Sequence, residues 1–177
     1  MRCPRLAELP KPPPSRRGWP WTQDTRPLPT RTGDGHRRPR VSIITPSLNQ
    51  GRFIEETIRS VLLQGYPHLE YIIIDGGSSD GTIDVVRKYS DWIAYWVSDP
   101  DKGQSNAINK GLKIAKGELI SYLDSDDFLI PGSLETATRQ FLDNKDAPDL
   151  VGGNNLLVDA NSHPLRLLEG GFFGLER

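Results

Sequence analysis

Cysteine is almost missing from this chain of 177 residues, which contains only Cys3. A single cysteine forms no internal disulfide and builds no cysteine-based zinc site, so a reducing compartment is favoured and we expect a cytoplasmic protein. Histidine is also scarce. His36, His68 and His163 share no metal-ligand spacing, and we assign chemistry to none of them.

Long apolar runs are absent as well. No stretch approaches the roughly 20 apolar residues that cross a bilayer, and the N-terminus lacks the apolar run of a secretory signal. The glycine-rich segment 76–81 does not have the G-x-G-x-x-G order of a dinucleotide fingerprint, which disfavours a nicotinamide cofactor.

The net charge of -1 hides a strong asymmetry along the chain. Residues 1–40 carry ten Lys and Arg against three Asp and Glu, whereas residues 41–177 carry 12 basic and 20 acidic residues. An acidic body argues against nucleic acid, and it suits a site that takes up a metal cation before it meets a phosphate. The basic N-terminal part leaves peripheral contact with an anionic membrane open.

Residues 1–40 hold nine prolines and nine arginines with few aliphatic side chains. Such a composition buries too little surface to offset the entropy of ordering it. We therefore predict a largely disordered Pro/Arg-rich arm over 1–40 and one domain over 41–177. Trp19 and Trp21 leave two interpretations open, since these indoles either dock on the body or stay exposed in a linker.

From residue 41 onward, short apolar runs alternate with helical patterns. The unbroken run from Tyr71 to Ile74 is typical of a strand covered on both faces, as in a parallel sheet. Strands are predicted at 41–45, 69–75, 93–97 and 118–123, with one or two more in 150–158, and helices near 54–62, 81–89, 104–116 and 131–143. This alternation predicts a doubly wound, mostly parallel α/β sheet.

Four residues mark the expected helix ends. Asn49 and Asp80 are suitable N-caps for the first and second helices, and Gly65 is a suitable stop for the first. Pro131 suits the first position of the fourth helix.

Polar clusters follow each of the four strands, at 45–49, 75–78, 99–104 and 124–127. Ligands of such sheets bind at the carboxyl ends of the strands, so we expect these clusters to lie along one edge.

Asp124-Ser125-Asp126-Asp127 is the sharpest of these clusters. Its carboxylates repel each other by up to ~4 kcal/mol per pair at ~4 Å unless a cation lies between them. Mg²⁺ or Mn²⁺ would relieve the repulsion through oxygen ligands and could bridge to a diphosphate. The alternative is a solvated acidic turn in which one Asp caps the next helix.

Two further clusters suggest contacts with a nucleotide. Asp75 could accept a hydrogen bond from the imide N–H of uracil or thymine, or from a ribose hydroxyl. Lys102 and Gln104 open a helix, where backbone donors and a lysine could face phosphate. The alternatives are a simple glycine-rich turn after Asp75 and an ordinary surface lysine at Lys102.

Four motifs, read in order, resemble family-two glycosyltransferases of the GT-A fold. They are Val41-Ser-Ile-Ile-Thr-Pro-Ser-Leu-Asn, Ile74-Asp-Gly-Gly-Ser-Ser-Asp-Gly-Thr, Asp101-Lys-Gly-Gln and Leu123-Asp-Ser-Asp-Asp. The resemblance covers about residues 40–160. It implies an inverting, Mg²⁺- or Mn²⁺-assisted transfer of a sugar from a nucleotide-diphosphate donor to a saccharide or lipid-linked acceptor, in polysaccharide or glycoconjugate synthesis.

The resemblance also implies roles for individual residues. Asp124 and Asp126 match the metal-binding Asp-x-Asp, and Asp126 is the expected direct ligand. The expected donor-binding residues are Thr45, Pro46, Asn49, Asp75, Lys102, Gln104, Asp124 and Ser125.

Two features depart from the family. Gly76 stands where many members have a second Asp, so base recognition would rest on Asp75. The family's catalytic base comes from a later segment, and nothing around Glu169 or Glu176 marks either as that base. We expect a donor-binding half without its base.

Two alternatives remain. A sugar-phosphate nucleotidyltransferase would carry a glycine-rich, basic loop after the first strand, where this chain has only Arg52. A fragment that binds nucleotide sugar without transferring it is the other.

Overall fold

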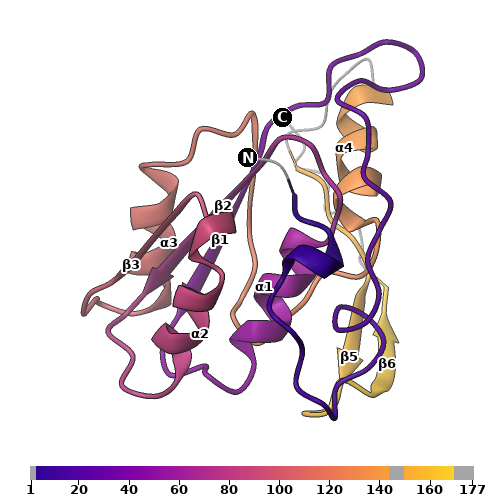
Figure 1. Cartoon of the computed structure of the whole chain (residues 1–177). Coiled ribbons are helices and arrows are strands. Elements are labelled where there is room, and N and C mark those ends of the chain that lie inside the picture. The colour runs from indigo at the N-terminus through magenta and orange to yellow at the C-terminus, as the bar shows by residue number, and fades with distance from the viewer. Residues whose placement is uncertain (1–2, 144–149, 170–177) are drawn as a thin grey trace. The chain divides into compact units, whose positions relative to one another are not determined.

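A computed structural model describes residues 3–143 and 150–169. The chain divides into two compact units between Ser133 and Leu134. Each unit is described by itself (Figure 1). None of the helices in the described ranges is long and apolar enough to cross a membrane.

The first unit contains a four-stranded parallel sheet, which confirms the predicted α/β class. Its strands are β1 (Val41–Ser47), β2 (Leu69–Asp75), β3 (Tyr95–Ser98) and β4 (Leu119–Tyr122). They lie in the order β3-β2-β1-β4. The two central strands are buried over nearly their whole length because helices cover both faces of the sheet.

The helices of this unit are α1 (Ile54–Leu62), α2 (Thr82–Lys88) and α3 (Gln104–Leu112), with a 3₁₀ turn, η2, at Ser90–Trp92. The chain runs outward from β1 to β3 through α1 and α2, then returns through α3 to β4 on the other side of β1 (Figure 1). Right-handed crossovers therefore place α3 on the face opposite α1 and α2. The sheet is doubly wound, as predicted.

Close packing of α3 on β1 depends on a glycine. A Cβ at Gly111 would lie 2.5 Å from a methyl carbon of Ile44, so no larger residue fits without a shift. Ile44, Ile72, Ile74 and Ala107 form the buried cluster beneath this helix.

Several predicted boundaries were wrong by a few residues. Pro46 does not end the first strand, which continues to Ser47. Asn49 is not the N-cap of α1, because that helix is preceded by Phe53 and Asn49 instead has a positive φ of 54°. Gly65, with φ 64°, does follow the end of α1.

Asp80 lies one residue before the N-cap of α2, which is Gly81 rather than Asp80 as predicted. Its carboxylate accepts the backbone N–H of Thr82, the first residue of that helix, at 2.9 Å.

The structure does not confirm the loose N-terminal arm. Trp21 is only 5% exposed, and the guanidinium carbons of Arg16 and Arg59 lie 5.3 and 5.4 Å from its ring centroid. Trp19 donates its indole N–H to the carbonyl of Leu129 at 2.7 Å. Of the two interpretations of the tryptophans, docking is therefore the correct one.

Arg59 of α1 explains why composition misled. Its side chain is fully buried, and a buried guanidinium requires acceptors. The arm supplies three of them, the carbonyls of Pro10, Pro20 and Trp21, at 2.9, 3.1 and 3.2 Å. Proline lacks a backbone N–H but keeps its carbonyl, so a proline-rich segment serves well here.

Cys3 also belongs to this packed arm. Its thiol donates to the carbonyl of Tyr66 at 3.1 Å, and burial raises the pKa of the Cys3 thiol to about 11. The thiol is thus an unreactive packing group at neutral pH.

The second unit contains α4 (Ser133–Asp143), whose first residue belongs to the first unit, and an antiparallel pair, β5 (Asn155–Val158) and β6 (Pro164–Leu168). The helix begins two residues later than Pro131 predicted. One strand falls within 150–158 as expected, whereas β6 was not predicted.

Candidate functional site

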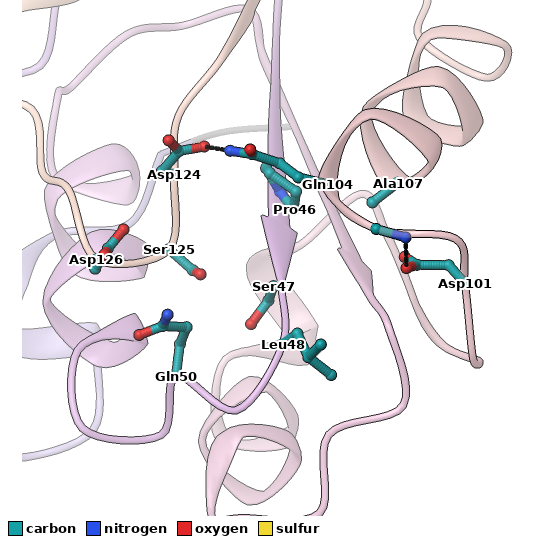
Figure 2. A pocket seen from close by; sticks show the side chains of 11 residues that line it. Pro46, Ser47, Leu48, Gln50, Asp101, Gln104, Ala107, Asp124, Ser125 and Asp126 are labelled. Atoms are coloured by element: carbon teal, nitrogen blue, oxygen red, sulfur yellow. Dashed lines mark hydrogen bonds between the residues drawn. The ribbon is translucent and has the colours of Figure 1, made fainter.

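A cavity of about 340 Å³ opens where β1 and β4 end (Figure 2). This is the point at which the chain reverses direction across the sheet, since β1 leads outward to β2 and β4 lies on its other side. Such switch points leave a crevice between diverging loops. The cavity is lined by Pro46, Ser47, Leu48, Gln50, Asp101, Gly103, Gln104, Ala107, Asp124, Ser125 and Asp126.

The acidic segment after β4 forms one wall of this cavity. Asp124 is half-buried, and its Oδ1 accepts a hydrogen bond from Nε2 of Gln104 at 2.6 Å, marked by a dashed line in Figure 2. Ser125 is 4% exposed, whereas Asp126 is exposed. Gln104 is the first residue of α3, so the helix start and the acidic segment meet across the cavity.

The electrostatics of the cavity are one-sided. Three carboxylates line it, those of Asp101, Asp124 and Asp126, and within the described parts of the chain no Lys or Arg is among the lining residues. Partial burial, together with the negative charges of Asp126 and Asp124, raises the pKa of the Asp127 carboxyl. A cation bound at this wall would relieve that repulsion.

Over residues 3–143 and 150–169, no three His, Cys, Asp or Glu side chains are grouped closely enough to hold a metal on their own. Mg²⁺ needs no such group where one or two carboxylates hold it and phosphates and water complete its coordination. Asp124 and Asp126 are the pair that could do so.

Comparison with known proteins gives the family. The model of glycosyl transferase family 2 matches residues 42–168, well over half of the chain. The chain belongs to glycosyltransferase family 2.

Individual relatives agree with this assignment. The chain is 43% identical over 93 residues, 51% of its length, to a Bacillus subtilis (strain 168) protein provisionally assigned to teichuronic acid biosynthesis as the glycosyltransferase TuaG. It is 36% identical over 120 residues, 67% of its length, to chondroitin synthase of Pasteurella multocida (strain Pm70). The matches cover 37% and 12% of these relatives.

A solved structure supports the GT-A type of fold. The mannosyltransferase PcManGT of Pyrobaculum calidifontis, in complex with GDP-Man and Mn²⁺, is 32% identical with a TM-score of 0.50, over 54% of this chain and 30% of that one.

Four of the residues expected at the donor site line the cavity, together with the second Asp of the Asp-x-Asp. Pro46, Gln104, Asp124 and Ser125 lie beside Asp126 in the lining, on three different elements of the fold. The fold therefore brings together residues up to 80 positions apart in the sequence, as expected from the binding of ligands at the carboxyl ends of the strands.

Asp75 lies elsewhere, at the buried end of β2. It is 1% exposed and is not among the lining residues. Its carboxylate accepts hydrogen bonds from the N–H groups of Gly77 and Ser78 at 3.0 and 2.8 Å and from the hydroxyls of Ser78 and Ser98. The protein thus uses Asp75 to shape the turn after β2.

Thr45, Asn49 and Lys102 also lie outside the lining. Thr45 is buried and its hydroxyl pairs with that of Tyr71 at 3.1 Å. The side chain of Asn49 accepts the N–H of Ser79 at 2.9 Å, which joins the loops after β1 and β2. Lys102 is exposed just before α3.

Asp101 is the residue that sequence reasoning missed. It lines the cavity, and its Oδ1 accepts the N–H of Gly103 at 2.7 Å. A Cβ at Gly76 would lie 3.2 Å from the Asp101 carboxyl carbon, so this carboxylate fills the space beside the glycine. The polar cluster 99–104 and the motif Asp101-Lys-Gly-Gln pointed to this edge of the sheet, but only Lys102 and Gln104 of that cluster were expected to contact the donor.

Proposed function

We propose that this cavity binds the diphosphate of a nucleotide sugar through Mg²⁺ or Mn²⁺ held by Asp124 and Asp126. The observation that carries the proposal is the acidic lining without a basic lining residue in the described ranges. A diphosphate would be repelled by such a wall, whereas a cation–diphosphate complex would be attracted to it.

The reaction proposed for the whole protein is an inverting hexosyl transfer. The bond between the anomeric carbon and the diphosphate oxygen breaks, and a bond to the acceptor oxygen forms on the opposite face. A carboxylate base takes the proton of the acceptor hydroxyl. We assign that base to no described residue. The proposed acceptor is a saccharide or a lipid-linked saccharide in polysaccharide or glycoconjugate synthesis.

The residues of this chain bind and orient the donor. Asp124 and Asp126 hold the cation, and Gln104 fixes the carboxylate of Asp124 through its amide N–H. When bound, the cation stabilises the charge that grows on the departing diphosphate. Lys102 lies two residues before Gln104 and is proposed to reach a phosphate oxygen.

The nucleoside end is proposed to lie toward the turn after β2. Asp75 shapes that turn, and its Oδ1 accepts a hydrogen bond from the Ser78 hydroxyl while its Oδ2 accepts the other three, so a donor on the base is proposed to share Oδ1 with Ser78.

Calorimetry tests this function. UDP, dTDP and GDP are each titrated into the protein with Mn²⁺ and again with a chelator. We expect at least one of them to bind only with Mn²⁺. Equal affinity in both conditions for every nucleotide that binds, or no binding at all, would contradict the proposal.

A further inference from the structure

The acidic segment is held by a helix that does not line the cavity. Thr57 of α1 is 1% exposed, and its Oγ1 lies 2.9 Å from the carbonyl oxygen of Ser125 and 2.7 Å from that of Asp127. These two carbonyls flank Asp126. A single buried hydroxyl therefore shares its one hydrogen between the carbonyls on both sides of the proposed metal ligand.

Two more polar residues, Ser60 of α1 and Gln64 just after it, extend this support along the segment. The N–H of Leu129 donates to Oγ of Ser60 at 3.0 Å, and the Ser60 hydroxyl donates to the Thr57 carbonyl at 2.8 Å. Nε2 of Gln64, just after α1, donates to the carbonyl of Ile130 at 3.0 Å. Positions 57 and 60 share one face of α1, Gln64 follows in the turn after it, and all three side chains are buried.

The N-terminal arm adds a third support from outside the sheet. The indole N–H of Trp19 donates to the carbonyl of Leu129 at 2.7 Å. The arm is in turn fixed to α1 by Arg59, which donates to the carbonyls of Pro20 and Trp21 beside it. The arm and α1 thus both form hydrogen bonds to the segment that follows β4.

We propose that Thr57, Ser60, Gln64 and Trp19 are positioning residues that set the backbone of residues 124–130, so that the carboxylates of Asp124 and Asp126 are aligned for a cation–diphosphate complex. The proposal rests on the function proposed above. None of the four lines the cavity, so their influence on a ligand must pass through the backbone of the segment.

A purely structural role would give a different result. Side-chain hydrogen bonds to buried carbonyls stabilise a fold in general, and their loss leaves the carbonyls unsatisfied. A positioning role adds a local effect, because ligand residues held loosely bind a metal more weakly even while the protein stays folded.

Thr57→Val is the decisive variant, since it removes the hydroxyl and nearly preserves the shape. Thr57→Ser keeps the hydroxyl and serves as the rescue. Thr138→Val is the matched control, because Thr138 is 2% exposed and, among the described residues, its hydroxyl bonds to carbonyls of its own helix, those of Leu134 and Glu135, at 2.7 and 3.1 Å.

The first measurement is the affinity for whichever of UDP, dTDP and GDP binds the unmodified protein most tightly with Mn²⁺. We expect Thr57→Val to weaken it by roughly tenfold or more, the scale of losses when support behind a metal ligand is removed. Thr57→Ser should stay within about twofold, and Thr138→Val should not change it.

The second measurement needs no ligand. Amide hydrogen exchange of a peptide that spans residues 124–130 should be faster in Thr57→Val than in the unmodified protein, and unchanged in Thr57→Ser and Thr138→Val. Trp19→Phe, which keeps a ring but loses the N–H, should shift both measurements in the same direction by less. It also provides a test if Thr57→Val does not fold.

The outcomes separate this proposal from the proposed function. Unchanged exchange in Thr57→Val and Trp19→Phe overturns the positioning role. Faster exchange with unchanged affinity overturns its connection to the ligand. If no diphosphate binds the unmodified protein with Mn²⁺, the proposed function fails, while the exchange data still decide whether these residues fix the segment.

Discussion

The ends of β2 and β4 make an instructive pair, because both carry aspartates at the same edge of one sheet. Asp75 is 1% exposed, and its carboxylate accepts four hydrogen bonds from its own turn and from Ser98. Asp124 and Asp126 line a cavity, and across the described parts of the chain Gln104 is the one recorded donor to their carboxylates. The carboxylate after β2 is used by the protein's own hydrogen-bond donors, whereas the carboxylates after β4 have oxygens available to a ligand.

The pKa values of nearby carboxyl groups follow the same division. After β2, the hydroxyl of Thr82 and backbone N–H groups lower the pKa of Asp80. After β4, burial and neighbouring negative charges raise the pKa of Asp127. Donors stabilise the ionised form in the first loop, while the second loop lacks a counter-charge. The comparison teaches that an acidic motif indicates a metal only where the protein does not already use its oxygens.

Asp126→Ala should have the largest effect on nucleotide affinity, because it removes one of the carboxylates after β4 that are available to a ligand. Loss of one of two metal-ligating carboxylates should lower Mn²⁺-dependent nucleoside diphosphate affinity by at least about 100-fold, more than loss of a supporting residue would. Calorimetry measures this. The control is Asp91→Ala, an exposed Asp in η2 away from the cavity. Wild-type affinity in Asp126→Ala would remove Asp126 from the metal site.

Asp75→Asn tests the other strand end. Because an amide replaces a charged acceptor of four hydrogen bonds, the free energy of unfolding should fall by roughly 2–3 kcal/mol. Urea denaturation measures the fall, with Asp91→Asn as control. A large loss of nucleotide affinity without a loss of stability would show instead that Asp75 contacts the base directly.

Gln104→Ala sharpens the comparison by removing the one donor to Asp124. We expect Mn²⁺-dependent affinity to fall by roughly three- to tenfold, because the carboxylate loses its orienting hydrogen bond but remains in place. The Mn²⁺-dependent nucleotide affinity of Gln104→Ala should be measured by calorimetric titration and compared with that of Lys102→Ala. If Lys102→Ala is more damaging, direct phosphate binding by the lysine outweighs the orientation of Asp124.

The smallest effect concerns the titration of Asp80. Its pKa is lowered in the folded protein, so ionised Asp80 stabilises the fold above its ordinary value of 3.8, and this contribution is lost as pH falls through the folded pKa. Thr82→Val should raise the pKa of Asp80 toward 3.8, which narrows the pH range between the folded pKa and the ordinary value. Carboxyl-carbon NMR titration measures it, and an unchanged pKa would assign the shift to the backbone donors.

Sequence patterns were most informative where the structure depends on residues that are close together in the sequence. Apolar runs such as 71–74 and the strand–helix alternation predicted a parallel, doubly wound sheet, and helix-start chemistry placed Asp80 within one residue of the true N-cap of α2, Gly81. Composition failed for residues 3–40, because it measures apolar burial and takes no account of a buried arginine that requires carbonyl acceptors.

The sequence by itself thus determined which polar clusters follow the strands. Their motifs resemble those of nucleotide-sugar enzymes, and one acidic cluster follows a strand of the sheet. Only the tertiary structure decided which carboxylates remain available. Asp75 ends one strand and Asp124 follows another, yet Asp75 is buried and accepts hydrogen bonds from its own turn and from the distant Ser98, whereas Asp124 faces a cavity. Hydrogen bonds across 20 to 110 positions, from Gln104, Thr57 and Trp19, depend on how the chain folds back on itself, and no local pattern encodes them.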